Sequence, residues 1–168
     1  KGDAPERGEA GLRQELLGDL ACEVLLGTST PLYARLYREG LVNRSFSYGY
    51  DSVPGAAFLV AGGESRDPEA VRDAVAAEAA RIAREGVDPA LWERIKKGVY
   101  GSRVRSLNSS ETLCIGQAQS FFSGSDLLRF PEVFRQIARE DVEALIARWV
   151  IPERLALSVV RPGEEALA

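Results

Sequence analysis

The sequence contains no histidine and no methionine, and it has only two cysteines. Without histidine, the chain lacks the usual acid–base residue at neutral pH and the commonest zinc ligand. A serine or cysteine nucleophile would need another base, and neither Lys96 nor Lys97 has the Ser-x-x-Lys spacing of lysine-assisted hydrolases. The carboxylates show no calcium-loop spacing. We therefore expect no catalytic residue, no metal ligand and no cofactor in this chain.

Signals for a membrane or a nucleic-acid partner are also missing. No apolar run approaches the 18 or so residues that a membrane-spanning helix needs. The net charge of -4 argues against nucleic acid, because binding to phosphates needs a clustered excess of cations. Cys22 and Cys114 both fall in apolar helical patterns, where a thiol behaves as a small hydrophobic group. So little cysteine favours a reduced, cytoplasmic setting.

The length of 168 residues fits one domain with its own hydrophobic core. The chain begins at Lys1 and contains no methionine anywhere. We therefore expect a single domain over residues 1–168 that was excised from a longer parent chain.

Apolar spacing and capping residues predict a mostly helical chain. A buried stripe between Leu12 and Leu25 predicts the first helix, which Gly27 ends. The pair Thr30-Pro31 predicts the start of a second helix, which Gly40 ends. Later helices are predicted to begin at Asp67-Pro68, at Asp88-Pro89, at the capping-box-like Asn108–Glu111, at Pro131 and near Val142.

Strand patterns occur in two places. From residue 42 to residue 50 large apolar side chains alternate with small polar ones, which predicts a half-buried strand. A turn at 51–55 leads into Ala56–Gly63, so the two runs predict an antiparallel hairpin. Leu155–Val160 predicts a closing strand. The order of elements indicates an α+β fold with helices packed on one face of an antiparallel sheet. Three strands make a thin sheet, so we expect a fourth strand ahead of Lys1.

Four phrases, in this order, resemble the C-terminal half of the pitrilysin/insulinase-type zinc peptidases, the inverzincins. They are GTSTPLYARLYREGLVNRSFSYGY, VAGGESRDPEAV, LWERIKKGVYGSRVRSLNSSETL and EDVEALIARWVIPERLALSVVRP. The nearest likeness is to bacterial proteins that resemble mitochondrial processing peptidase, and it covers nearly the whole chain. The resemblance implies two homologous α+β halves around a chamber, with the zinc motif H-x-x-E-H in the N-terminal half. It also implies a strand just before Lys1.

Many members of that family bind substrate through an arginine and a tyrosine on the pattern L-[FY]-x-x-[IL]-R-x-x-x-G-L-x-Y. Counting forward from Leu32 puts Tyr37 at the arginine, and counting back from Gly40 puts Leu36 there. Asn43 stands at the tyrosine. The pair is therefore missing from its usual place. This departure fits a parent whose pair comes from a partner subunit, and it also fits a parent that has lost activity.

The resemblance implies a non-catalytic domain that forms part of the substrate chamber of a zinc-dependent metalloendopeptidase, whose zinc the parent holds elsewhere. The implied partners are the N-terminal half of the parent chain, a homologous subunit and a peptide substrate. Asn43, Ser45 and Ser47 are the candidate substrate-binding residues, because alternation places them on the polar face of the first strand; a solvated sheet face is the alternative. A structural or assembly subunit without proteolytic activity is the second hypothesis, and a small-molecule enzyme is the third.

Overall fold

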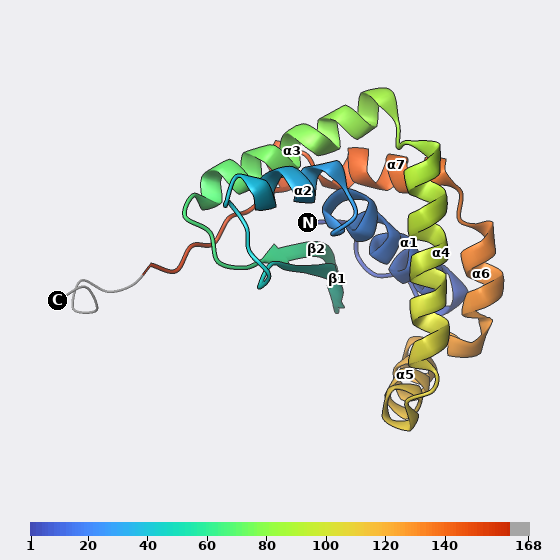
Figure 1. Cartoon of the computed structure of the whole chain (residues 1–168). Helices are drawn as coiled ribbons and strands as arrows, with labels where there is room; N and C mark the ends of the chain where they lie inside the picture. The colour runs from blue at the N-terminus through green and yellow to red at the C-terminus, as the bar shows by residue number, and fades with distance from the viewer. Residues whose placement is uncertain (162–168) are drawn as a thin grey trace.

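The computed structural model describes residues 1–161, and within them it contains seven α-helices and one antiparallel hairpin (Figure 1). In chain order the elements are α1 (Gly8–Leu26), α2 (Pro31–Arg38), β1 (Ser47–Val53), β2 (Ala56–Gly62), α3 (Pro68–Glu85), α4 (Pro89–Ser106), α5 (Ser110–Ser123), η1 (Leu127–Arg129), α6 (Phe130–Gln136), α7 (Arg139–Trp149) and η2 (Pro152–Arg154). The α+β class predicted from the sequence is confirmed.

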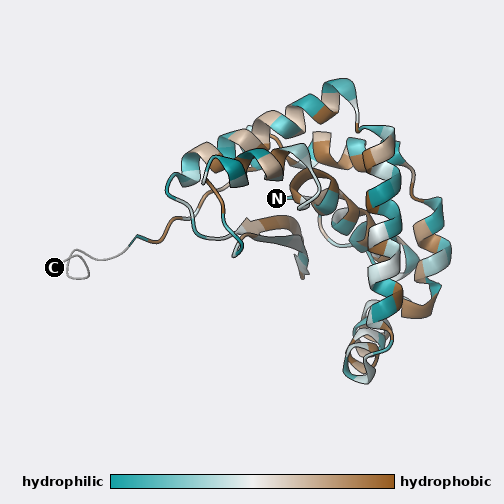
Figure 2. Ribbon diagram, viewed as in Figure 1, coloured by the Kyte–Doolittle hydropathy of each residue, from teal (hydrophilic) through white to brown (hydrophobic). Residues whose placement is uncertain are grey.

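Helix α1 is the centre of the packing. It contacts the hairpin on one side and helices α3, α4, α6 and α7 on others, and its Leu16 and Leu20 are fully buried. Ile146 of α7 and Phe134 of α6 join the same hydrophobic core. Figure 2 shows apolar residues on α1 and β2, whereas much of α4 is hydrophilic. The hairpin is thus held against one helix that is itself surrounded by others.

The predicted starts of α2, α3 and α4 are confirmed, and each has an N-cap side-chain hydrogen bond, which α6 and α7 lack. The side chains of Thr30, Asp67 and Asp88 accept hydrogen bonds from backbone N–H groups in the first turns of α2, α3 and α4, and a proline follows each cap. The start of α5 differs by one residue, because the Ser109 side chain, rather than Asn108, accepts the N–H of Thr112. Cys22 is buried as expected, but Cys114 on α5 is exposed.

The hairpin begins later than its sequence pattern predicts. Strand β1 starts at Ser47, because Asn43 forms a local turn in which its side-chain Oδ1 accepts the N–H of Ser45 at 2.8 Å. Such side-chain hydrogen bonds compete with strand pairing. The register runs from Ser47 opposite Gly62 to Val53 opposite Ala56. The predicted placement of Asn43 and Ser45 on a strand is therefore wrong.

One face of the hairpin is packed and the other is open, as the predicted one-sided helix packing requires. Tyr48, Tyr50 and Leu59 pack against the core, while Ser47 and Val60 on the other face are exposed. The predicted closing strand is not present in the structure, because Leu155–Val160 has no strand partner and is assigned no regular structure.

Gly18 is expected to be essential for the contact between α1 and the hairpin. A Cβ at Gly18 would overlap the ring of Tyr50. We expect Gly18→Ala to lower the free energy of unfolding by about 1–3 kcal/mol, although alanine favours helix by roughly 1 kcal/mol. Gly98→Ala in α4 is the matched control, because no atom lies within 4 Å of its added Cβ; it should stabilise by up to about 1 kcal/mol. Urea unfolding of both variants measures the difference, and equal effects would contradict the predicted overlap.

Candidate functional site: the hairpin and its surroundings

Both edges of the hairpin expose main-chain hydrogen-bonding groups, since the sheet in the described part of the chain has only two strands. A two-residue loop joins Val53 to Ala56, and the pair that closes such a loop exchanges hydrogen bonds. Antiparallel pairs alternate, so the intervening residues direct their N–H and C=O groups outward. These outward residues are Tyr48, Tyr50 and Ser52 on β1, and Ala57, Leu59 and Ala61 on β2. Two of these groups already have partners: the Ser52 N–H donates to Asp51 Oδ1 and the Ala57 carbonyl accepts the Gly2 N–H, each at 2.7 Å.

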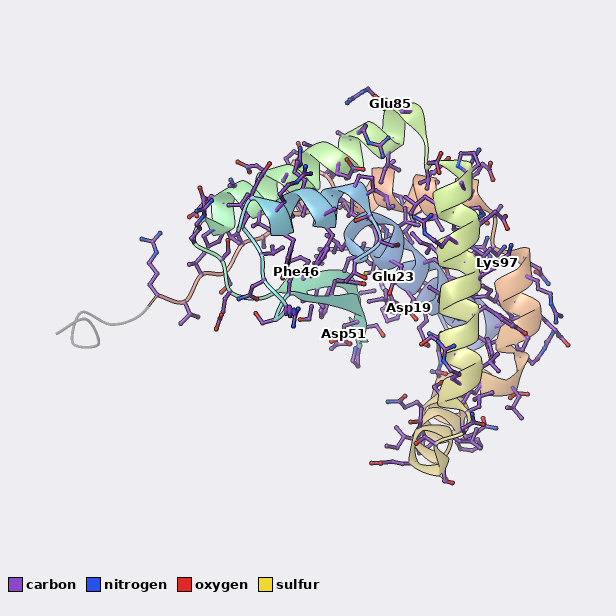
Figure 3. The ribbon with its side chains drawn as sticks, viewed as in Figure 1. Asp19, Glu23, Phe46, Asp51, Glu85 and Lys97 are labelled. Carbon is purple, nitrogen blue, oxygen red and sulfur yellow. The ribbon has the colours of Figure 1, made fainter. Side chains whose placement is uncertain are left out.

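A continuous run of aromatic rings connects α2 with β1. Tyr37 stacks on Tyr33 with ring centroids 5.9 Å apart. Phe46 lies 6.3 Å from Tyr33 and 6.4 Å from Tyr48. Figure 3 labels Phe46 beside the hairpin, below α2. A polypeptide along the outer edge of β1 would therefore pass next to apolar, polarisable surface.

The three predicted substrate-binding residues lie together at the open end of the hairpin, but in a different arrangement from the one expected. Asn43 Nδ2 donates to Glu64 Oε2 at 3.0 Å, and Ser45 Oγ accepts from the Glu64 N–H at 3.4 Å. Ser47, the first residue of β1, donates its hydroxyl to the Gly62 carbonyl at 3.4 Å. Asn43 and Ser45 thus tie the segment before β1 to the segment after β2. Contact of these residues with a substrate remains a prediction.

Sequence reasoning missed a group of charged and polar residues beneath the hairpin. Glu15, Asp19 and Glu23 follow one another at four-residue intervals, so they share one face of α1. Arg103 of α4 contacts Asp19 and lies 2.7 Å from Glu15 Oε1, and the Tyr48 hydroxyl donates to Glu23 Oε2 at 3.2 Å. Figure 3 shows Asp19 and Glu23 between the hairpin and α4. The four-residue spacing was the available sequence signal.

Burial dominates the electrostatics of this group. It raises the pKa values of the Asp19 and Glu23 carboxyl groups, and the positive charge of Arg103 offsets part of the change at Asp19. Burial, with the nearby Glu23 charge, raises the pKa of Tyr48 to about 12. The pKa of the Cys22 thiol also rises to about 12, mainly through burial, so this thiol is not a nucleophile at neutral pH.

Within residues 1–161 no group of three or more histidine, cysteine, aspartate or glutamate residues is placed to hold a metal ion. None of the helices in the described part is long and apolar enough to cross a membrane.

Comparison with known proteins gives a consistent result. The family model described as "Peptidase M16 inactive domain" matches residues 6–99, more than half of the chain. The uncharacterised zinc protease YmfH of Bacillus subtilis (strain 168) is 28% identical over 155 residues, which are 92% of this chain and 36% of YmfH. The chain thus spans about a third of the length of this relative.

Two solved structures share the fold. An M16-like peptidase from Alicyclobacillus acidocaldarius aligns with a TM-score of 0.80 at 22% identity, over 86% of this chain and 35% of the other. A zinc protease from Bordetella pertussis Tohama I aligns with a TM-score of 0.64 at 17% identity, over 91% and 85%. The resemblance seen in the sequence, to the half of these peptidases that does not hold zinc, is confirmed. This chain belongs to the peptidase M16 inactive domain family.

Proposed function

We propose that this domain forms part of the substrate chamber of a zinc-dependent metalloendopeptidase and binds an extended peptide along the outer edge of β1. The match of the inactive-domain family model to residues 6–99, a range that includes the whole hairpin, carries the proposal. The zinc and its ligands belong to another part of the parent protein. The residues of this chain do not fit a zinc site, because it has no histidine and its described residues contain no metal-binding cluster.

Binding at β1 would rely on the backbone. The N–H and C=O groups of Tyr48 and Tyr50 point outward and are available to pair with an added strand. Main-chain pairing makes little demand on the peptide sequence, while the ring of Phe46 next to the strand favours apolar side chains. The domain thus holds and aligns a peptide, and the other half of the parent supplies the chemistry.

The partners of this domain follow from the same proposal. The N-terminal half of the parent chain, or a homologous subunit, would close the chamber opposite the hairpin. We place the parent in the cytoplasm on the low cysteine content of the chain. The second candidate is an assembly subunit without proteolytic activity, which the replacement of the expected substrate-binding tyrosine by Asn43 favours. An H-x-x-E-H motif in the parent sequence would support the peptidase, and its absence would support the assembly subunit.

Peptide binding at β1 can be tested by hydrogen exchange. An unstructured 12-residue peptide added to the chain should slow exchange of the Tyr48 and Tyr50 amides. Ser52→Pro should weaken binding about three- to tenfold, because the proline ring at this edge position blocks pairing with an added strand. Ser52→Ala adds no ring and should bind like the unmodified chain. Peptide binding that leaves the β1 amides unprotected, or that tolerates Ser52→Pro, would contradict the proposal.

A further inference from the structure

Helix α5 exposes its large apolar residues and buries small or polar ones. Its one buried residue is Ser120, which lies on the same face as the half-buried Gly116. On the outward face Ile115 is 51% exposed, and Phe121 and Phe122 are 78% and 76% exposed. A surface helix of a soluble protein normally turns its apolar stripe toward the core. The distribution of residues around α5 is therefore the reverse of the usual one.

Contacts with the rest of the chain fix which face of α5 points outward. The Arg7 guanidinium donates to the Phe122 carbonyl at 3.3 Å, and a Cβ at Gly116 would lie 2.9 Å from a methyl carbon of Leu127 in η1. Helix α5 also contacts α1. Figure 1 shows α5 at one end of the molecule, below α4 and α6. The outward face of α5 thus projects from the body of the molecule, where another protein can reach it.

The exposed side chains form a continuous stripe along α5. Successive members lie three or four residues apart on the helix, so they share one face. The α5 stripe consists of Cys114, Ile115, Ala118, Phe121 and Phe122, all of them exposed. Phe121 and Phe122 meet edge to face with ring centroids 5.6 Å apart. The small Ala118 side chain lies at the centre of the stripe, with larger side chains toward both ends, so a second helix can approach closely there.

Charge and area both suit a second copy of the same surface. Glu111 is the only charged residue of α5, so two copies of the stripe meet without like-charge repulsion. The five side chains of the stripe expose about 500 Å² of mainly apolar surface, as large as the patches that mark interaction sites on monomeric proteins. Two copies would together bury about 1,000 Å², which is the lower limit for a specific interface.

We propose that α5 is a self-association surface, through which two copies of this chain pack their α5 helices antiparallel about a twofold axis at Ala118. The contact is isologous, because the same stripe serves both copies. Each Phe121 packs beside Ile115 of the second copy. Each Phe122 packs beside Cys114 of the second copy, and a sulfur atom next to an aromatic ring is a favourable contact.

The same arrangement keeps the charges of α5 apart. Glu111 falls opposite Ser125 of the second copy rather than opposite another glutamate. The dimer is weak, with a Kd of about 10–100 µM, because its interface is small. In unfolding experiments at about 1 µM the chain is therefore monomeric, and truncation of Phe121 has little effect on stability there. The surface involves neither strand of the hairpin, so the proposal does not rest on peptide binding at β1.

Sedimentation velocity tests the self-association. Between about 1 and 300 µM the chain should change from monomer to mostly dimer. Phe121→Asp should raise the dimer Kd at least tenfold, because it places a charge in an apolar contact. The monomer should keep its circular dichroism spectrum, since Phe121 is exposed. Val160→Asp is the matched control, because Val160 is an apolar residue outside α5 with 95% exposure, and it should leave the Kd unchanged.

A cross-link tests the register of the two helices. In a Cys114→Ser background, Ala118→Cys places one thiol of each copy next to the twofold axis, where the two can form a disulfide. Gln119→Cys in the same background is the matched control, because Gln119 is exposed but lies to one side of the stripe. With copper–phenanthroline and dioxygen as the oxidant, the Ala118→Cys chain should form the intermolecular disulfide at least tenfold faster.

Three results would overturn the proposal. The first is a monomer at every concentration up to about 300 µM, or equal Kd values for the two aspartate variants. The second is equal cross-linking of the two cysteine variants. The third is a monomeric chain whose Cys114 resists thiol labelling only within a longer parent protein, because another part of that protein would then cover the α5 stripe. None of these results bears on peptide binding at β1.

Discussion

Trp149→Ala is expected to lower the free energy of unfolding by about 3–5 kcal/mol. The Trp149 side chain is buried at the end of α7, where its ring stacks on Tyr50 of β1 with centroids 6.4 Å apart. Its indole N–H donates to Asp3 Oδ2 at 3.2 Å, and the ring also lies against Gly2. Loss of this side chain therefore removes one contact shared by α7, the hairpin and the N-terminal segment.

Urea unfolding followed by circular dichroism measures this effect. Phe121→Ala is the control, because this large aromatic on α5 is 78% exposed and its truncation should change stability by less than about 0.5 kcal/mol. Hydrogen exchange in the Trp149 variant should accelerate first in the hairpin. A loss below about 1 kcal/mol would mean that Trp149 does not hold these elements together.

The helical part of the fold was predictable because its signals are local. Asp67 and Asp88 each stand directly before a proline, and each caps its helix with its own side chain. Such a helix start can be predicted without knowing which residues distant in the sequence contact it. The predicted beginning of β1 was wrong for an equally local reason. The Asn43 side chain accepts a hydrogen bond from the Ser45 N–H, and this bond forms a turn in place of strand pairing.

The closing strand shows where a sequence pattern is insufficient. Within Leu155–Val160 only Leu155 packs against the core, and Leu157 is half as exposed as Val160 or less. Pairing, however, needs a neighbouring strand, and a groove separates this segment from β2. Strand pairing depends on two segments. The pattern in one segment can therefore indicate which side chains share a face, but it does not show which strand pairs with it.

The polar group beneath the hairpin could not be assembled from the sequence, because Arg103 and Asp19 are 84 positions apart. Four-residue spacing places Glu15, Asp19 and Glu23 on one helix face, yet such a stripe is usually solvated. The packing of α4 against α1 brings the guanidinium to the stripe. The candidate peptide-binding edge of β1 was predicted only in part. Alternation in the sequence predicts the hairpin, but only the tertiary structure shows which of its edges is exposed.

Arg103→Met is expected to destabilise the protein by about 2–3 kcal/mol at pH 7. Removal of one partner from a buried ion pair leaves the other charge uncompensated. The value lies below the range for fully buried pairs because the Asp19 side chain is still 32% exposed. Lys97→Met is the control: Lys97 pairs with Glu93 on the surface with 80% exposure, so its loss should cost less than about 1 kcal/mol.

The pH dependence distinguishes loss of the charge pair from loss of packing. Burial already holds the pKa of Asp19 above its ordinary value, and without Arg103 it should rise further. A carboxyl group with a raised folded-state pKa favours folding below its unfolded-state pKa, and this stability is lost as the pH rises through the folded-state pKa. The deficit of Arg103→Met should therefore shrink as the pH falls from 7 into the range where Asp19 takes up a proton. Asp19→Asn in the same variant should recover most of the stability at pH 7, and a deficit that is independent of pH and not rescued would mean that Arg103 acts through its aliphatic stem alone.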